Sequence, residues 1–284
     1  MFKKRIWKRI LIGSAWAISL GGLIVLMSFI EFKEAGVFCK QVKIYIPGNQ
    51  YFIDKEEVDH ILKINRHQLI GRNMASINLH DLENRLKANA FIESAKVYAD
   101  MDGIIKVEIS QRQPVMRVMN QSGQDFYIDQ NGLKIPMSSN FTAKVLAANG
   151  YIDEAFGKKL DTLHTDIAKE LFKTAQFINK DSLWSAQVAQ VYVNQEHEIE
   201  LIPRVGNHRI LLGNADSLES KFHNLLVFYK QALPQIGWDR YKVINIKFAN
   251  QVVGVKGDNF KKDSLKVTAK ADSLKMIKDT FTNN

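Results

Sequence analysis

The sequence is poor in the residue types that define several protein classes. Cysteine occurs once and proline five times among 284 residues, and glycine shows no period. One cysteine excludes an intrachain disulfide framework, and the missing glycine period excludes a collagen-like chain. Hydrophobic residues make up 46% and aromatic residues 10%, which excludes a wholly disordered chain. The composition therefore predicts a globular protein, and the length predicts two domains.

The sequence also lacks the common motifs of catalysis and cofactor binding. It contains no H-E-x-x-H, G-x-S-x-G, Walker or G-x-G-x-x-G motif. The seven histidines are scattered, and although His60 and His67 could share a helix face, no acidic or cysteine partner completes a metal set. We therefore expect a protein that is not an enzyme and that has no cofactor, metal or small-molecule substrate.

The net charge of +9 comes from the two ends of the chain. Residues 256–284 hold seven lysines against four aspartates, whereas residues 10–255 hold 27 basic and 26 acidic groups. A nucleic-acid footprint would lie on the folded part of the protein, so the near-neutral middle argues against nucleic-acid binding. The other basic end, residues 1–9, has no acid and carries Lys3, Lys4, Arg5, Lys8 and Arg9.

Residues 10–30 form the one long uncharged run of the sequence. As a helix this run would be about 32 Å long, enough to cross the hydrocarbon core of a bilayer. The cations before it predict a cytoplasmic tail over 1–9, a transmembrane helix over 10–30 and extracytoplasmic domains after it. A cleaved signal peptide is the alternative, but the run is too long and no A-x-A site follows, so we expect an uncleaved anchor.

After a juxtamembrane linker over 31–40, residues 41–113 show a β-α-α-β-β pattern. A short strand over 42–46 precedes a helix that Asp54 caps, and leucines at helical spacing mark a second helix over 79–86. Strands over 95–100 and 105–110 flank a turn with the Asp-Gly hairpin signal. The single Cys39, just before the first strand, is expected to be a small buried or membrane-proximal residue.

Pro114 marks the boundary to a second domain over 114–256, because proline cannot donate to a sheet ladder. Strand patterns dominate this domain, and two helices are expected to pack on them, one from Thr165 or Asp166 and one over 217–233. Its last strands are expected over 243–248 and 252–255. Residues 257–284 are rich in Lys, Asp, Ser and Thr and are expected to form a flexible tail. The predicted fold class is therefore α+β: one transmembrane helix, a β-α-α-β-β domain and a mixed β-sheet domain with packed helices.

This arrangement resembles the FtsQ (DivIB) family of bacterial cell-division proteins, which carry a POTRA domain after a single span. The resemblance lies in V-K-I-Y-I-P-G-N (42–49), I-N-L-H-D-L-E-N-R-L (77–86) and F-I-E-S-A-K-V (91–97). Arg112 and Pro114 lie in a stretch similar to the family's E-R-x-P-V junction, and residues 126–132 resemble the hairpin that opens its β domain. The region I-N-I-K-F…V-V-G-V (244–255) is similar to the family's terminal strands, with Lys247 and Phe248 in place of Arg and Tyr.

The resemblance implies a divisome scaffold of the inner membrane that is concentrated at the division septum. Such a protein would bind FtsB, FtsL and other divisome proteins and link them to septal peptidoglycan synthesis. A strand at a sheet edge can accept a partner strand, which suits this role. The residues expected to bind FtsB in this way are Lys247, Phe248, Ala249, Val252 and Val253, with Leu225 and Tyr229 on the preceding helix.

Two alternatives stay open at this point. Val252 and Val253 could be core residues of an internal strand rather than partner-facing ones. The chain could also be another periplasmic POTRA-type interaction protein, acting in envelope assembly or secretion. An anchored enzyme or sensor would need a nucleophile or paired carboxylates, and the sequence contains no such constellation.

Overall fold

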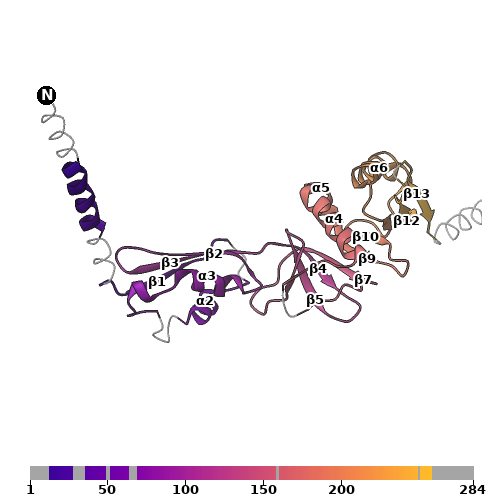
Figure 1. The fold of residues 1–284 in the computed structure, drawn as a ribbon. Coiled ribbons are helices and arrows are strands. Elements are labelled where there is room, and N and C mark those ends of the chain that lie inside the picture. The colour runs from indigo at the N-terminus through magenta and orange to yellow at the C-terminus, as the bar shows by residue number, and fades with distance from the viewer. Residues whose placement is uncertain are drawn as a thin grey trace, which may run out of the picture. The chain divides into compact units, whose positions relative to one another are not determined.

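A computed structural model describes residues 13–27, 36–48, 52–63, 69–157, 160–248 and 250–257. The chain divides into two compact units, one of residues 1–112 with 139–141 and one of residues 113–138 with 142–284 (Figure 1). The predicted cytoplasmic tail, with Lys3, Lys4, Arg5, Lys8 and Arg9, lies outside the described residues. So do Ala249 and the predicted tail from residue 258 onward.

Residues 13–27 are helical, in the middle of the predicted span over 10–30. The two ends of that span, residues 10–12 and 28–30, lie outside the described residues. Among the residues that the structure describes, none of the helices combines the length and the apolar character that crossing a membrane requires.

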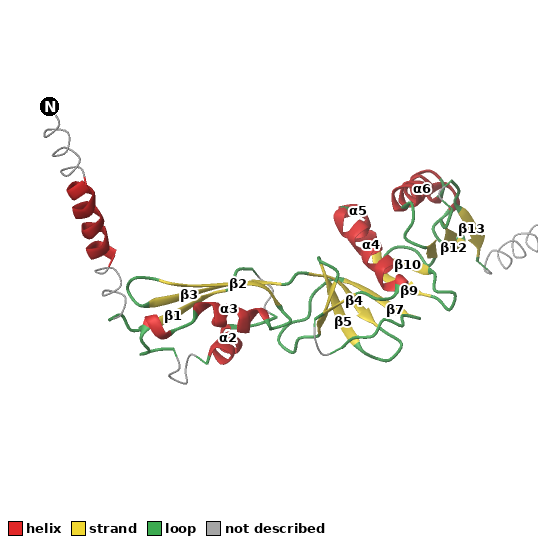
Figure 2. Cartoon of the chain, in the orientation of Figure 1, coloured by secondary structure: helices red, strands yellow, loops and turns green. Residues whose placement is uncertain are grey.

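Unit 1 contains a three-stranded sheet with α-helices packed against it, as Figure 2 shows. The strand order is β1-β3-β2, with β1 parallel and β2 antiparallel to the central strand β3. This confirms the β-α-α-β-β order expected from the sequence. The elements are β1 (Gln41–Tyr45), α2 (Lys55–Leu62), the 3-10 helix η2 (Met74–Ser76), α3 (Leu79–Lys87), β2 (Ile92–Ala99) and β3 (Ile104–Gln111).

Local sequence chemistry sets the ends and faces of these elements. Asp54 caps α2 by accepting a hydrogen bond from the Glu57 amide at 2.8 Å, as the capping box predicts. Strand β3 alternates, so that Ile105, Val107 and Ile109 are buried and their neighbours are more exposed. The helix leucines and these strand residues share one hydrophobic cluster, which also holds the buried Cys39.

Unit 2 is built on a ten-stranded mixed sheet with the order β13-β12-β11-β10-β9-β7-β4-β5-β6-β8. Parallel pairs occur at β4·β7, β7·β9 and β11·β12, and the other pairs are antiparallel. The strands are β4 (Pro114–Met119), β5 (Asp125–Asp129), β6 (Leu133–Pro136), β7 (Leu146–Gly150), β8 (Asp161–Thr162), β9 (Val188–Val193), β10 (Ile199–Pro203), β11 (Arg209–Gly213), β12 (Tyr241–Asn245) and β13 (Val253–Lys256).

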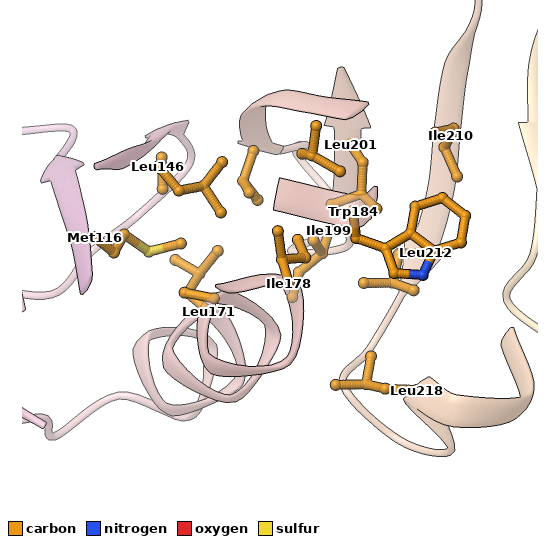
Figure 3. Packing of buried hydrophobic residues seen from close by; sticks show 14 of the residues in the cluster. Met116, Leu146, Leu171, Ile178, Trp184, Ile199, Leu201, Ile210, Leu212 and Leu218 are labelled. Atoms are coloured by element: carbon orange, nitrogen blue, oxygen red, sulfur yellow. The ribbon is translucent and has the colours of Figure 1, made fainter. Parts of the chain in front are cut away.

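The helices of unit 2 are α4 (Asp166–Lys180), α5 (Ser182–Gln187), α6 (Leu218–Gln231) and α7 (Leu233–Ile236). Thr165 caps α4, at the start expected from the sequence. Figure 3 shows Leu171 and Ile178 of α4 among the strand residues Met116 and Ile199, within one cluster. Phe177 of α4 and Phe222 of α6 lie with ring centroids 4.8 Å apart, so both helices contribute to the same core.

The structure differs from the sequence-based expectation in two respects. Strands β6, β7 and β8 and helices α5 and α7 were not predicted, since most of them are short. The strand expected over 243–248 ends at Asn245. The side-chain Oδ1 of Asn245 accepts a hydrogen bond from the Lys247 amide at 2.9 Å. Such an asparagine bond to the amide two residues on is typical of a turn and marks the end of the strand.

Candidate functional site

The candidate site is the free edge of the unit 2 sheet at β13. Among the residues that the structure describes, this strand is last in the sheet order, pairs with β12 alone and is largely exposed. At the opposite edge, β8 has only two residues and offers little backbone for pairing. An exposed edge strand carries a row of backbone N–H and C=O groups that another chain can pair with. β13 is therefore the strand of unit 2 best suited to accept a partner strand.

The two faces of the β12–β13 pair differ in character. On the core face, Ile244 lies opposite Gly254 and is fully buried. A Cβ at Gly254 would lie 2.4 Å from the Tyr241 ring, so glycine allows this ring to cover the strand. On the open face, Val255 pairs with Val243 and is 52% exposed, and Val253 is 43% exposed. The open face of the edge is thus an apolar valine strip beside a free backbone.

One hydrogen bond indicates which backbone groups of β13 point away from the sheet. The Gly257 amide donates to the Arg240 carbonyl at 3.2 Å, toward β12. Because backbone direction alternates along a strand, Val253 and Val255 also direct their N–H and C=O groups toward β12. Gly254 then directs its groups outward, where a partner strand would bind them.

The residues expected from the sequence fall into three groups. Phe248 is 54% exposed next to the edge, and Val253 lies on it. Lys247 forms an ion pair with Glu198, and Val252 packs partly on the core. Ala249 lies outside the described residues.

Leu225 and Tyr229 lie in the hydrophobic core of unit 2, not on the surface of α6. Leu225 is fully buried and Tyr229 is 9% exposed. The Tyr229 hydroxyl lies 2.8 Å from Nε2 of the buried His208. In this structure both side chains are core residues, so we leave them out of the partner-facing surface. Their helical spacing in the sequence could not separate the core face of α6 from its exposed face.

The core around α6 contains three buried side chains with polar groups, which are His208, Lys221 and Tyr229. Burial lowers the pKa of His208, and the Asp239 carboxylate opposes that shift. Burial also raises the pKa of Tyr229, so the hydroxyl stays protonated. Lys221 at the start of α6 donates from Nζ to the Leu212 carbonyl at 3.1 Å, and burial lowers its pKa. These bonds join α6 to the strand that precedes β12 in the sheet.

The sequence pointed to the β12–β13 loop but missed part of the edge. The sequence analysis did not single out Val243, Val255 or Lys256. The V-V-G-V pattern does indicate that Val255 shares a face with Val253. A strand pattern says which residues share a face, but not which face is covered. Only the helix packing on the opposite face decides that Val253 and Val255 stay exposed.

The described surface also has hollows away from the β13 edge. One of about 310 Å³ in unit 2 is lined by Asp153, Asp166, Glu170 and His197 among others. Another of about 600 Å³ lies along β1 and β3 in unit 1. Within the described ranges, no group of three or more His, Cys, Asp or Glu side chains could hold a metal ion.

A segment of each unit matches the model of a known protein family. Residues 113–255 match the family model described as FtsQ/DivIB, C-terminal related, which covers about half of the chain. Residues 37–110 match the model described as POTRA-like domain. No curated protein matches the chain.

Proposed function

Because the chain belongs to the FtsQ/DivIB family, we propose that it is a non-enzymatic scaffold of the bacterial division machinery. In this proposal one span over residues 10–30 holds it in the inner membrane, and the domains that follow the span lie on the periplasmic side at the septum. The 21-residue uncharged run and the five cations before it support this topology. Its partners would be FtsB, FtsL and other divisome proteins, whose assembly it couples to septal peptidoglycan synthesis.

The observation that carries the proposal is the free, valine-lined edge of β13. A partner strand that pairs there would gain main-chain hydrogen bonds from the outward groups of Gly254. Its alternate side chains would cover Val253 and Val255, which are 43% and 52% exposed in the free chain. Phe248, which is 54% exposed in the β12–β13 loop, would supply an aromatic contact. We propose that FtsB adds its strand at this edge.

Lysine side chains around the edge favour a partner segment with acidic residues. Lys242 and Lys256 are exposed on β12 and β13, and Lys247 follows in the connecting loop. Glu198 already pairs with Lys247, so part of this charge is balanced within the unit. Charge around an interface steers encounter more than it adds affinity. We therefore assign the affinity to strand pairing and the valine strip.

A proline substitution at the edge tests the proposal directly. Lys256→Pro removes the backbone N–H of an edge-strand residue, and proline is tolerated on edge strands. Lys256→Ala is the matched control, because it loses the same charge and keeps the N–H. Partner capture by the full-length chain should fall about tenfold or more with proline and stay near the unsubstituted level with alanine. Capture of purified FtsB is the first measurement.

The same pair of variants tests the cellular role. Cells depleted of the chain should form filaments, and the alanine variant should restore septation where the proline variant does not. Both variants should unfold at the temperature of the unsubstituted protein, since neither changes the core. Equal FtsB capture by both variants would remove β13 as the binding edge. Normal septation in depleted cells would refute the division role itself.

A further inference from the structure

One end of unit 1 is formed by three segments that hydrogen-bond to one another. We call it the proximal tip and define it as residues 36–40, 69–74 and 100–103. The Cys39 amide donates to Arg72 O at 2.8 Å and the Gly71 amide donates to Cys39 O at 2.7 Å. The Lys40 amide donates to Gly103 O at 2.8 Å, which joins the first segment to the β2–β3 turn. The tip is therefore a fixed structure and not a set of independent loops.

Gly103 makes the contact of the turn with the first segment possible. Its φ is +80°, and a Cβ there would lie 2.3 Å from the Phe38 carbonyl oxygen. Only glycine allows the backbone to approach so closely in this conformation. The close approach brings the turn of residues 101–103 against the segment that carries Phe38.

Each segment of the proximal tip exposes one large apolar side chain. Phe38 is 55%, Ile70 is 39% and Met101 is 93% exposed, although Cys39 and Leu69 beside them are buried. Exposed apolar side chains gathered on one structural element mark an interaction surface more than scattered ones do. The exposed cations Lys40 and Arg72 lie in the same segments, and Asp102 is an exposed acid of the turn.

The short segment between the uncharged run and the proximal tip limits how far the tip can lie from a membrane. Five residues separate Ile30, the last residue of the uncharged run, from Gly36, the first residue of the tip. Such a segment spans no more than about 20 Å even when it is fully extended. If residues 10–30 cross the membrane, the proximal tip must lie within that distance of the lipid surface.

We propose that the proximal tip binds the surface of the lipid bilayer. Phe38, Ile70 and Met101 enter the boundary between headgroups and acyl chains, and Lys40 and Arg72 remain at headgroup level. Because Asp102 offsets part of the positive charge, the apolar side chains supply the binding and anionic lipid is not required. This contact would hold unit 1 at a fixed height above the membrane. The inference rests on the membrane anchor of the proposed function.

Site-directed spin labelling of the full-length chain in phosphatidylcholine nanodiscs tests the inference. Met101→Cys and Ile70→Cys place labels on the tip, and Ser19→Cys places one in the proposed span. Ala88→Cys is the control, since exposed Ala88 precedes β2 while the tip follows it, about 25 Å along the sheet. The native Cys39 is 1% exposed, and the unsubstituted chain measures any labelling of it.

The readout is the ratio of oxygen to nickel-complex accessibility, which rises in lipid. We expect this ratio to be several-fold higher at residues 101 and 70 than at residue 88, and Phe38→Ser should lower it at residue 101. A water-like ratio at residues 101 and 70, with a lipid-like ratio at residue 19, would overturn the tip contact and leave the anchor intact. A water-like ratio at residue 19 as well would overturn the anchor and the inference together.

Discussion

At the scale of single residues, His208 is the most unusual side chain of unit 2. It is 2% exposed, and its Nε2 lies 2.8 Å from the Tyr229 hydroxyl. Its Nδ1 has no hydrogen-bond partner within the described part of the chain. The Trp238 ring packs against Tyr229 with centroids 5.3 Å apart, which keeps water from the imidazole. The site therefore suits a neutral histidine and disfavours a charged one.

This burial predicts a pH dependence of stability. Because the folded-state pKa of His208 lies below its ordinary value of 6.5, the unfolded chain binds more protons at mildly acidic pH. The free energy of unfolding of unit 2 should thus be highest above pH 6.5 and fall as the pH drops below it, by at most about 1.4 kcal/mol per pH unit for this one group. Urea unfolding between pH 7 and 5 measures the slope.

His208→Phe should flatten that slope, because it removes the titrating group. His223→Gln is the matched control, since His223 is exposed on the same helix–strand region. It should leave the slope unchanged. An unchanged slope in His208→Phe would mean that another group titrates in this window.

At the scale of elements, a buried ion pair fixes the start of α4 to the sheet. Lys134 of β6 and Glu154 are both 1% exposed, and Lys134 Nζ lies 2.6 Å from Glu154 Oε1. Glu154 also accepts from the amide and hydroxyl of Thr165, the cap of α4, both at 2.8 Å. Burial opposes ionisation of this carboxyl, but the bonds from Lys134 and Thr165 outweigh it and lower its pKa.

Removing one partner of this ion pair should therefore lower the free energy of unfolding. Lys134→Met leaves a buried carboxylate without its cation, and we expect it to reduce the free energy of unfolding by about 3–5 kcal/mol. The double variant Lys134→Met with Glu154→Gln should recover part of that loss, because it buries no charge. Chemical denaturation followed by circular dichroism measures the free energy of unfolding of the unsubstituted protein, the single variant and the double variant.

The exposed pair Lys169–Asp166 on α4 provides the comparison, with side chains 50% and 96% exposed. Lys169→Met should change stability by less than about 1 kcal/mol, because solvent screens the pair. A loss in Lys134→Met as small as in Lys169→Met would show that the buried pair does not hold α4.

At the scale of the whole molecule, orientation across the membrane is the property to test. The five cations of residues 1–9 should hold that end in the cytoplasm and place both units outside. Alkaline phosphatase fused after residue 257 should therefore be active, and a fusion after residue 9 should be inactive. The reverse pattern would place the units in the cytoplasm, where they could not meet periplasmic partners.

Much of this protein could be predicted from its sequence. The β-α-α-β-β order of unit 1, the caps Asp54 and Thr165 and the hairpin β9–β10 follow from local signals that need no distant partner. Periodicity, capping and turn chemistry act over a few residues, so a pattern in the chain is enough to reveal them. The charge distribution likewise revealed that residues 1–9 and 256–284, not the residues between them, produce most of the net charge of +9.

Only the tertiary structure decided which sides of these elements are free. Leu225 and Tyr229 share a helical stripe with other apolar residues, and packing on the sheet places them in the core. Val253 and Val255 alternate like buried strand residues, yet β13 is an edge with an open face. The parallel strands β11 and β12 are separated in the sequence by helices α6 and α7. Sequence spacing does not encode the pairing of such distant segments. Local chemistry thus forms the elements, and long-range packing selects the surface left for a partner.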